Sequence, residues 1–395
     1  MNKSLPYLLL TAMTLLFAAS CENDDTDFST YALVTTDDED EDDELLDTTD
    51  TIYVVYNAAS ASVAGDTGGK VSVSGADVTV TDTATTCGLV LVLSGSTDDG
   101  SLLVYRSRKY TIVLNGVSIT NPDGAAINNQ CSKSLYIVCP EKTVNALADG
   151  TTYAEQTYDQ KGTLFSEGQL YLSGAGTLNV NAHCKNGIVS DDYITIDDDV
   201  VVTINSATTA TNGMKANDGM FINGGNLNIN VTADGARGIK CDAKTLVTGG
   251  TVSITTTGGC LIETVDGVAV DTTSAACIRC DSLFSISGGT MTLLSMGDGG
   301  KGIRCNENIE LSGGSLYVTT TGGNEQGKPK ALKSDTGIIV SGGYLNASVE
   351  KSWACDNGTD SEAPADHLTV KGTPTVKNIE KKQVEVSYYD TKQDK

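Results

Sequence analysis

The chain has 395 residues and a formal net charge of -25 at pH 7. From residue 51 onward, 37 acids outnumber 25 bases, so this part would repel phosphate backbones; we expect no nucleic-acid partner, and a cation such as Ca2+ is favoured instead. Such a length predicts two domains unless an internal repeat accounts for it, and a repeat is present.

The N-terminus is typical of an exported protein. Lys3 precedes an apolar run at 8–17 that is too short to span a bilayer, and small residues lead to Cys21. This ending resembles a bacterial lipoprotein signal, which predicts that residues 1–20 are removed and that Cys21 is acylated. The acids directly after Cys21 resemble the export signal of some Gram-negative lipoproteins, so we expect an outer-membrane lipoprotein exposed at the cell surface. The alternative is a signal peptide with an incidental cysteine.

An acidic segment follows at 21–51. Residues 22–50 hold 14 acids and no Lys or Arg, so they cannot bury enough apolar surface to order themselves. We interpret the segment as a disordered tether and place a single domain at 52–395. The ends of a stack of repeats would expose open sheet edges, so we expect caps near 52–80 and 365–395.

The repeat is clearest from residue 164 onward. An apolar residue, taken as position zero, returns mostly at steps of about 25 residues. The position-zero residues are Leu164, Ile188, Met214, Ile239, Ile278, Ile303 and Leu332. Gly-Gly follows at plus ten and plus eleven in the last five of these units, whereas 197–199, Asp-Asp-Asp, fill the corresponding corner of an earlier one.

Within each unit the apolar positions alternate with period two, which indicates strands. Three short strands per unit, bent at Gly-rich corners, each bury one face only when units stack. The sequence therefore predicts an all-β protein, a right-handed parallel β-helix with about 25 residues and three short strands per coil.

Alternation along the first strand predicts which columns of side chains face inward. Positions zero and plus two are expected inside, where plus two includes Cys241, Cys280 and Cys305 as small buried groups. Plus one and plus three are expected outside. The plus-one column reads Phe165, Val189, Lys215, Lys240, Arg279, Arg304 and Lys333, and the plus-three column reads Glu167, Asp191, Asn217, Asp242, Asp281, Asn306 and Asp335.

A column of bases beside a column of acids suggests a flat strip for a polysaccharide. The five bases, Lys215, Lys240, Arg279, Arg304 and Lys333, would meet sugar carboxylates. Calcium needs six to eight oxygens, so carboxylates of adjacent coils would have to converge on it. The predicted calcium ligands are Asp191, Asp192, Asp218, Asp242, Asp281 and Asp335. The alternative is a solvated ladder of charges that neutralise one another.

One unit is longer than the others. Ile239 and Ile278 are 39 residues apart, so 14 extra residues leave the stack around 260–277. Loops on a rigid scaffold often carry binding residues, but an extra hairpin or short coil without a ligand is an equally good interpretation.

Several blocks together resemble a known family. "YTIVLNGVSITNPDGAAI" (110–127), "LADGTTY" (147–153), "LYLSGAGTLNV" (170–180) and the repeated G-[IM]-[KR]-x-[DN] with Gly-Gly are similar to the carbohydrate-binding β-helix family first described from a cellulosome-producing bacterium. The resemblance covers about 52–350 and implies a fold like that of calcium-dependent pectate lyases, binding of cellulose-like or polygalacturonate-like glycans, and bound Ca2+. It also implies calcium roles for Asp191, Asp218, Asp242, Asp281 and Asp335.

Three functions stay open. A monomeric binder of acidic or cellulose-like polysaccharide, assisted by calcium and without a catalytic residue, is favoured. The second is a calcium-dependent polysaccharide lyase in which Lys215 or Lys240 is the base, although a base needs burial or cationic neighbours that an exposed strip lacks. The third is an adhesin or surface scaffold without a glycan ligand.

Overall fold

A computed structural model describes residues 28, 48–84, 86–207 and 209–379. The predicted signal peptide, the acylated Cys21, most of the tether and the end of the C-terminal cap lie outside these residues. Over 48–84, 86–207 and 209–379 the chain is built of β-strands, with a single short 3-10 helix, η2 (Pro364–His367). No helix of this part is long and apolar enough to cross a membrane.

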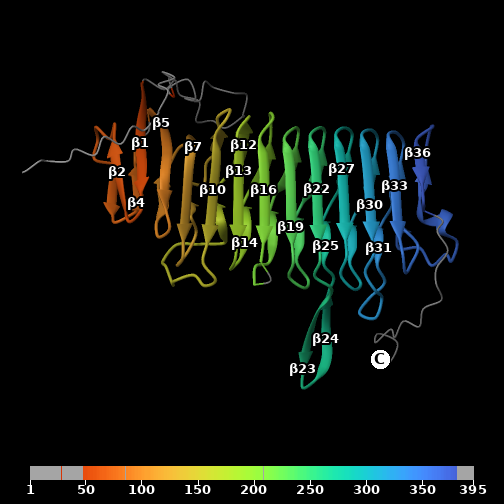
Figure 1. Cartoon of the computed structure of the whole chain (residues 1–395). Coiled ribbons are helices and arrows are strands. Elements are labelled where there is room, and N and C mark those ends of the chain that lie inside the picture. Colours follow the sequence, from red (N-terminus) through yellow and green to blue (C-terminus); the bar gives the residue numbers. More distant parts are fainter. Residues whose placement is uncertain (1–27, 29–47, 85, 208, 380–395) are drawn as a thin grey trace, which may run out of the picture.

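The strands form one twelve-stranded sheet, one twenty-two-stranded sheet and a separate hairpin. In Figure 1 the strands lie side by side along an elongated body, and the hairpin β23 (Leu261–Val265) and β24 (Val268–Thr273) projects away from it. The body is therefore a stack of repeats with one insertion.

The twelve-stranded sheet collects the first strand of each repeat. Its members are β3 (Val71–Ser74), β4 (Asp77–Asp82), β6 (Ser101–Arg106), β8 (Ile127–Asn129), β11 (Gly162–Ser166), β14 (Asn186–Ser190), β17 (Asn212–Ala216), β20 (Arg237–Cys241), β25 (Ala276–Cys280), β28 (Lys301–Cys305), β31 (Lys330–Ser334) and β34 (Cys355–Asp356). Apart from the antiparallel pair β3–β4, each strand pairs in parallel with the next.

The larger sheet begins as one ladder and then divides. Its first strands are β1 (Thr48–Asn57), β2 (Ser60–Ala64), β5 (Cys87–Thr97) and β7 (Tyr110–Asn121). The first half of β7 pairs with β9 and the second half with β10. Between the halves, Asn145 Oδ1 accepts hydrogen bonds from the backbone N–H of Gly116 and Val117, 2.9 and 3.0 Å away. From this point of the chain onward, the second and third strands of each repeat are separate strands.

The two branches hold the second and third strands of the repeats. The second strands are β9 (Leu135–Cys139), β12 (Leu170–Gly174), β15 (Tyr193–Ile196), β18 (Gly219–Ile222), β21 (Lys244–Val247), β26 (Phe284–Ile286), β29 (Ile309–Leu311), β32 (Ile338–Val340) and β35 (Thr369–Val370). The third strands are β10 (Val144–Asp149), β13 (Thr177–Ala182), β16 (Val201–Ser206), β19 (Asn226–Val231), β22 (Thr251–Thr256), β27 (Thr290–Ser295), β30 (Ser315–Thr320), β33 (Tyr344–Val349) and β36 (Thr375–Lys377).

The predicted all-β class with parallel pairing is confirmed, and so is the register. Every position-zero residue from Leu164 to Ile303 pairs with the position-zero residue of the next repeat. All of them are buried, as are Cys241, Cys280 and Cys305. The ten cysteines of the described residues are unbonded thiols. The apolar columns thus form one continuous core.

The outward prediction is wrong at the start of the plus-one column. Phe165 and Val189 are fully buried. Lys161 Nζ lies 5.3 Å from the centre of the Phe165 ring, and the carbonyl of Asp159 accepts a hydrogen bond from Asn128. The segment that precedes β11 therefore covers this end of the sheet, which explains why apolar residues stand there in place of bases.

The two glycines of each corner are required for different steric reasons. In the pair that follows β21, a Cβ on Gly249 would lie 2.1 Å from the Asn223 carbonyl oxygen, and Gly250 has φ +76. Where three aspartates replace the Gly-rich corner, Asp198 itself adopts φ 56. The repeated Gly-Gly is therefore required by close backbone approach and by a left-handed conformation.

Replacing Gly250 by alanine should destabilise the protein by about 3 kcal/mol, because the new Cβ adds a clash to the unfavourable φ. The Cβ would lie 2.2 Å from the Gly224 carbonyl oxygen. Gly267, in the hairpin turn, is the matched control, since it has φ +78 but nothing within 4 Å of its Cβ position. Urea unfolding of G267A should show a loss of only about 1 kcal/mol. Equal losses for the two variants would contradict the close-packed corner.

Candidate functional site

The five predicted ligand-binding bases lie on one face of the twelve-stranded sheet. Lys215, Lys240, Arg279, Arg304 and Lys333 pair in register on the five successive strands β17, β20, β25, β28 and β31. Their side chains are 23–29% exposed. Because adjacent strands are about 4.8 Å apart, the structure produces a straight row of cations across the strands.

All five of these bases have a carboxylate partner. Lys240 Nζ lies 2.8 Å and Lys215 Nζ 3.5 Å from the carboxylate of Asp242. Burial raises the pKa of Asp242, but the hydrogen bonds and charges of the two lysines outweigh this and lower it overall. Arg279 pairs with Asp281 at 2.9 Å, and Lys333 with Asp356 at 3.0 Å.

Arg304 reaches across to the next strand. Its two terminal nitrogens each donate to one oxygen of Asp335 at 2.7 Å, which holds the pKa of Asp335 below its usual range. The plus-three residue on its own strand is Asn306, which donates to Asp281. The row is therefore a ladder of paired charges, as the alternative interpretation of the sequence expected.

The six predicted calcium ligands do not come together. Asp242, Asp281 and Asp335 are each bound by a base, Asp192 accepts a hydrogen bond from Gln169, and Asp218 is exposed. These carboxylates are as far apart as the strands that carry them, and the bases that lie between them keep their oxygens from meeting.

Asp191 lies in a different group. Carboxylate oxygens of Asp191, Asp159 and Glu167 lie within 4.8 Å of one another. Among the described residues, no other group of three or more Asp, Glu, His or Cys side chains brings its ligand atoms this close together. Lys161 forms ion pairs with Asp159 and Asp191. Burial is the main cause that raises the pKa of Glu167, and the charge of Asp191 raises it further. The charge of Lys161 acts in the opposite direction. The three carboxylates therefore carry more negative charge than Lys161 alone can neutralise.

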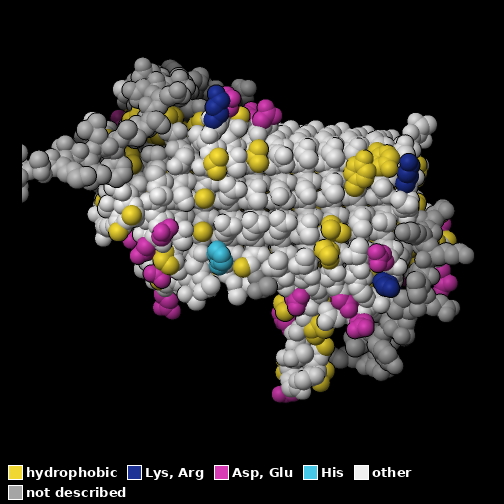
Figure 2. Space-filling model, in the orientation of Figure 1, with side chains coloured by type: hydrophobic (Ala, Val, Ile, Leu, Met, Phe, Trp, Pro, Cys, Tyr) yellow, Lys and Arg dark blue, Asp and Glu magenta, His cyan; other side chains and the backbone are white. Residues whose placement is uncertain are grey.

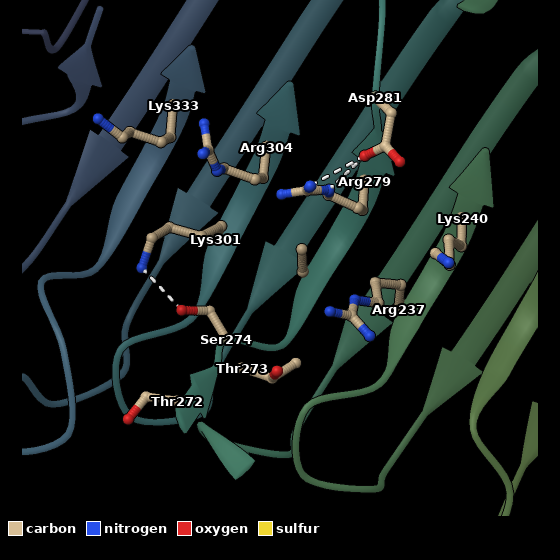
Figure 3. Close-up of a pocket in the computed structure, with 11 residues that line it drawn as sticks. Arg237, Lys240, Thr272, Thr273, Ser274, Arg279, Asp281, Lys301, Arg304 and Lys333 are labelled. Carbon is tan, nitrogen blue, oxygen red and sulfur yellow. Dashed lines mark hydrogen bonds and ion pairs between the residues drawn. The ribbon is translucent and has the colours of Figure 1, made fainter. Parts of the chain in front are cut away.

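A groove opens beside the middle of the basic row, with a volume of about 470 Å³. Figure 3 shows basic side chains of β20, β25, β28 and β31 around it, with the end of the hairpin at one side. The residues that line it are Arg237, Lys240, Arg279, Lys301, Arg304 and Lys333, with Asp281, Ala276, Thr272, Thr273 and Ser274. The basic row and the predicted insertion therefore meet in one site.

Two of the six cations were missed by sequence reasoning. Arg237 and Lys301 stand at position minus two, where Ala276 lies between them in register. The minus-two column starts at Gly162 and continues with two asparagines, of which Asn212 donates to Asn186 at 2.8 Å. Aligning this column as the plus-one column was aligned would have revealed the change from asparagine to bases.

The half-buried position of these two side chains changes their acidity. Burial lowers the pKa of Lys301 to about 8, a shift that Arg304 and Lys333 add to and the Cys260 thiol opposes. Burial and the charge of Arg279 also lower the pKa of Arg237. Both shifts arise because the groove is crowded with positive charge and partly closed to water.

Aromatic residues form a second surface. Tyr136, Tyr171, Tyr193 and Phe221 follow one another across β9, β12, β15 and β18, and the Tyr136 and Tyr171 rings are stacked with centres 4.5 Å apart. Tyr317 and Tyr344 make a tilted pair further along. Trp353 stacks on His367, which is buried, so it packs against the C-terminal end.

Figure 2 shows a face of the body with few Lys or Arg side chains, where acids gather mainly around the hairpin and the ends. This face therefore presents few of the basic side chains of the described residues. The described chain therefore defines an all-β class of protein, a stack of parallel strands with a row of bases and a groove on one face.

The family is defined by a sequence match. The family described as "Carbohydrate-binding domain-containing protein" matches residues 74–273 and 229–327, which together span more than half of the chain. The chain belongs to this family.

Two individual proteins are similar to the chain. A "Carbohydrate-binding domain-containing protein" of Acetivibrio thermocellus is 33% identical over 100 residues, which are 24% of this chain and 35% of that protein, so the match spans about a third of the relative. The solved structure of "the polysaccharide lyase-like protein from C. thermocellum, Gadolinium derivative" is 21% identical, with a TM-score of 0.44 over 83% of this chain and 97% of that chain.

Proposed function

We propose that the protein binds an acidic polysaccharide in the groove of the twelve-stranded sheet. The observation that carries the proposal is the concentration of six bases around one open groove, on a chain whose family is carbohydrate-binding. Guanidinium and ammonium groups bind carboxylates by charge-assisted hydrogen bonds. A glycan that crosses the strands would present successive sugar units to successive repeats.

A right-handed parallel β-helix is the architecture that we propose for the stack. Its support is that the first, second and third strands of each repeat pair in parallel with their counterparts in the next repeat. Right-handed crossovers between parallel strands are strongly preferred. In such a coil every repeat adds one rung to the ligand surface, so the length of the glycan bound would scale with the number of basic rungs.

Calcium is a separate part of the proposal. Of the predicted ligands, Asp191 is the one with carboxylate neighbours, Glu167 and Asp159, close enough to share an ion. Three carboxylates can supply up to six oxygens, which suits calcium, provided that Lys161 moves aside. Calcium held there would strengthen the surface next to the basic row, and calcium removal should then weaken glycan retention.

The location at the cell surface is also proposed. It is supported by the sequence around Cys21 and by the acidic run after it. An acylated cysteine would anchor the domain in the outer membrane, and the run would hold the binding face away from the lipid. Mass spectrometry of the mature N-terminus, expected to show a diacylated or triacylated Cys21, tests this part independently of binding.

The experiment that tests the proposed function is retention of the protein on immobilised polygalacturonate and on cellulose, with Ca2+ or with EDTA. We expect retention on polygalacturonate that weakens as salt is raised, because screening reduces attraction between charges. A loss in EDTA would support the calcium part. Retention on neither glycan would contradict the function and favour the scaffold interpretation.

A lyase is the second candidate, and one observation favours it. The predicted bases Lys215 and Lys240 both contact Asp242, which leaves neither free for proton abstraction. Lys301, by contrast, combines burial and cationic neighbours with a pKa lowered to about 8. A lysine of this kind is suited to act as a general base near neutral pH. Ultraviolet absorbance of unsaturated uronate, formed from polygalacturonate with Ca2+, would demonstrate this activity.

A further inference from the structure

The six cations of the groove fall into two kinds. Lys240, Arg279, Arg304 and Lys333 each have a carboxylate within ion-pairing distance. For Arg237 and Lys301 no carboxylate lies within that distance among residues 48–84, 86–207 and 209–379. These two charges are therefore uncompensated by the part of the protein described.

The two side chains differ in their hydrogen bonds. Arg237 Nε is buried and finds no hydrogen-bond partner in the described part of the chain. Lys301 Nζ donates to Ser274 Oγ at 3.3 Å and to the Gly299 carbonyl. A buried donor without a partner and a charge without a counter-ion are both unfavourable, so a ligand that satisfies them would bind with a gain in free energy.

The space between them is set by the register. Ala276 occupies the strand between those of Arg237 and Lys301, so the smallest side chain of the three forms the floor. Two strand spacings, each about 4.8 Å, separate the two bases along the sheet. Thr272, Thr273 and Ser274, at the base of the hairpin, supply hydroxyl groups at the rim (Figure 3). The single carboxylate of the groove, Asp281, is engaged by Arg279.

We propose that Arg237, Lys301 and the hydroxyl groups of residues 272–274 form a subsite for one oxyanion substituent of the bound glycan, either a sulfate ester or a carboxylate. The subsite rests on the proposed function for its natural ligand and deepens it. The paired row binds the backbone of the glycan, whereas the subsite binds a charged substituent that points from the glycan toward the sheet. A neutral glycan leaves both bases unpaired, which makes this subsite the source of discrimination between acidic and neutral sugars.

The first test uses the protein with inorganic sulfate, so that it does not depend on finding the glycan. Acylation of Lys301 by a lysine reagent at pH 8 is followed by peptide mass spectrometry. We expect sulfate to slow the modification of Lys301 at least fivefold relative to equal ionic strength of chloride, and R237M to abolish the protection. Lys142, which is 86% exposed, should react equally in all conditions. Equal rates at Lys301 with sulfate and chloride would overturn the subsite.

The second test compares polygalacturonate, a sulfated glycan and cellulose. R237M/K301M should lose at least tenfold in affinity for whichever acidic glycan the wild-type protein retains, with no change on cellulose and an unchanged melting temperature. If the wild-type protein retains an acidic glycan and the double variant retains it equally well, the subsite is overturned while the proposed function stands. If sulfate protects Lys301 but no glycan is retained, the anion site stands and the proposed function fails.

The pH dependence of glycan affinity separates a ligand-binding role of Lys301 from a purely structural one. Lys301 faces the Cys260 thiol, Arg304, Lys333 and, more remotely, Asp356. Because Lys301 carries less charge above pH 8, affinity for the acidic glycan should fall as the pH rises from 7 to 9. In K301R the side chain stays charged over this range, so the fall should disappear. A fall of the same size in K301R would contradict the role of Lys301.

Discussion

Substituting glutamine for both Arg279 and Arg304 is expected to weaken binding of an acidic glycan about 100-fold. Each arginine would donate a charge-assisted hydrogen bond to the ligand, which contributes about 1.5–3 kcal/mol, so at the lower figure the loss of both amounts to about 3 kcal/mol. The two residues lie on neighbouring strands in the centre of the row, where β25 pairs with β28. Titration calorimetry with an oligogalacturonate measures the change directly.

Two controls separate binding from folding. The ion pairs lost in R279Q/R304Q are partly exposed, so urea unfolding should change by about 1 kcal/mol or less. Lys142→Gln removes a positive charge from a side chain that is 86% exposed and does not line the groove, and it should leave affinity unchanged. Affinity of R279Q/R304Q equal to that of the wild-type protein would show that the row does not touch the ligand.

Truncating Ile278 to alanine is expected to lower the free energy of unfolding by about 3 kcal/mol. The side chain is fully buried and stands in register between Ile239 and Ile303, so its removal leaves a cavity within the continuous core. Because each repeat is stabilised by its neighbours, a defect at the centre of the stack weakens the contact with the repeats on both sides. Urea unfolding followed by circular dichroism measures the loss.

Val270 offers the matched control for this cavity. It is an aliphatic residue of the hairpin and is 58% exposed, so V270A should change stability by less than about 0.5 kcal/mol. The contrast tests whether the hairpin lies outside the core that holds the stack together. A small loss in I278A, comparable with that of V270A, would contradict the stacked core.

The sequence predicted the columns because the repeat is a physical periodicity. Position zero must be apolar in every repeat, so Ile239, Ile278 and Ile303 could be aligned without a structure, and the register of the bases followed from them. The hairpin at 261–273 was one of the two interpretations of the insertion. Its turn was visible in the sequence as Asp266-Gly267, which both have positive φ.

The parts that were missed depend on contacts between segments outside the repeat. Burial of Phe165 and Val189 requires the segment before β11 to fold back, and no periodic pattern signals this. Arg237 and Lys301 were overlooked because alternation assigns position minus two to the interior. In the structure these two side chains nevertheless line the groove (Figure 3).

The calcium ligands illustrate the same limit. A column of aspartates was predicted to converge, but in a regular sheet each carboxylate is nearer to a base of its own or the next strand than to the other acids, as in the pair of Arg304 with Asp335. Asp159 and Glu167, which lie close to Asp191, belong to a loop and a strand end that the ligand prediction did not include. The position of the loop, and not the repeat, therefore decides which carboxylates come together.

The most direct test of the account is a crystal structure of the protein with an oligogalacturonate. We predict sugar density that crosses β20, β25 and β28, with carboxylates within hydrogen-bonding distance of Arg279 and Arg304. Sugar density over the aromatic side chains of Tyr136, Tyr171 and Tyr193, with the basic groove empty, would contradict the account.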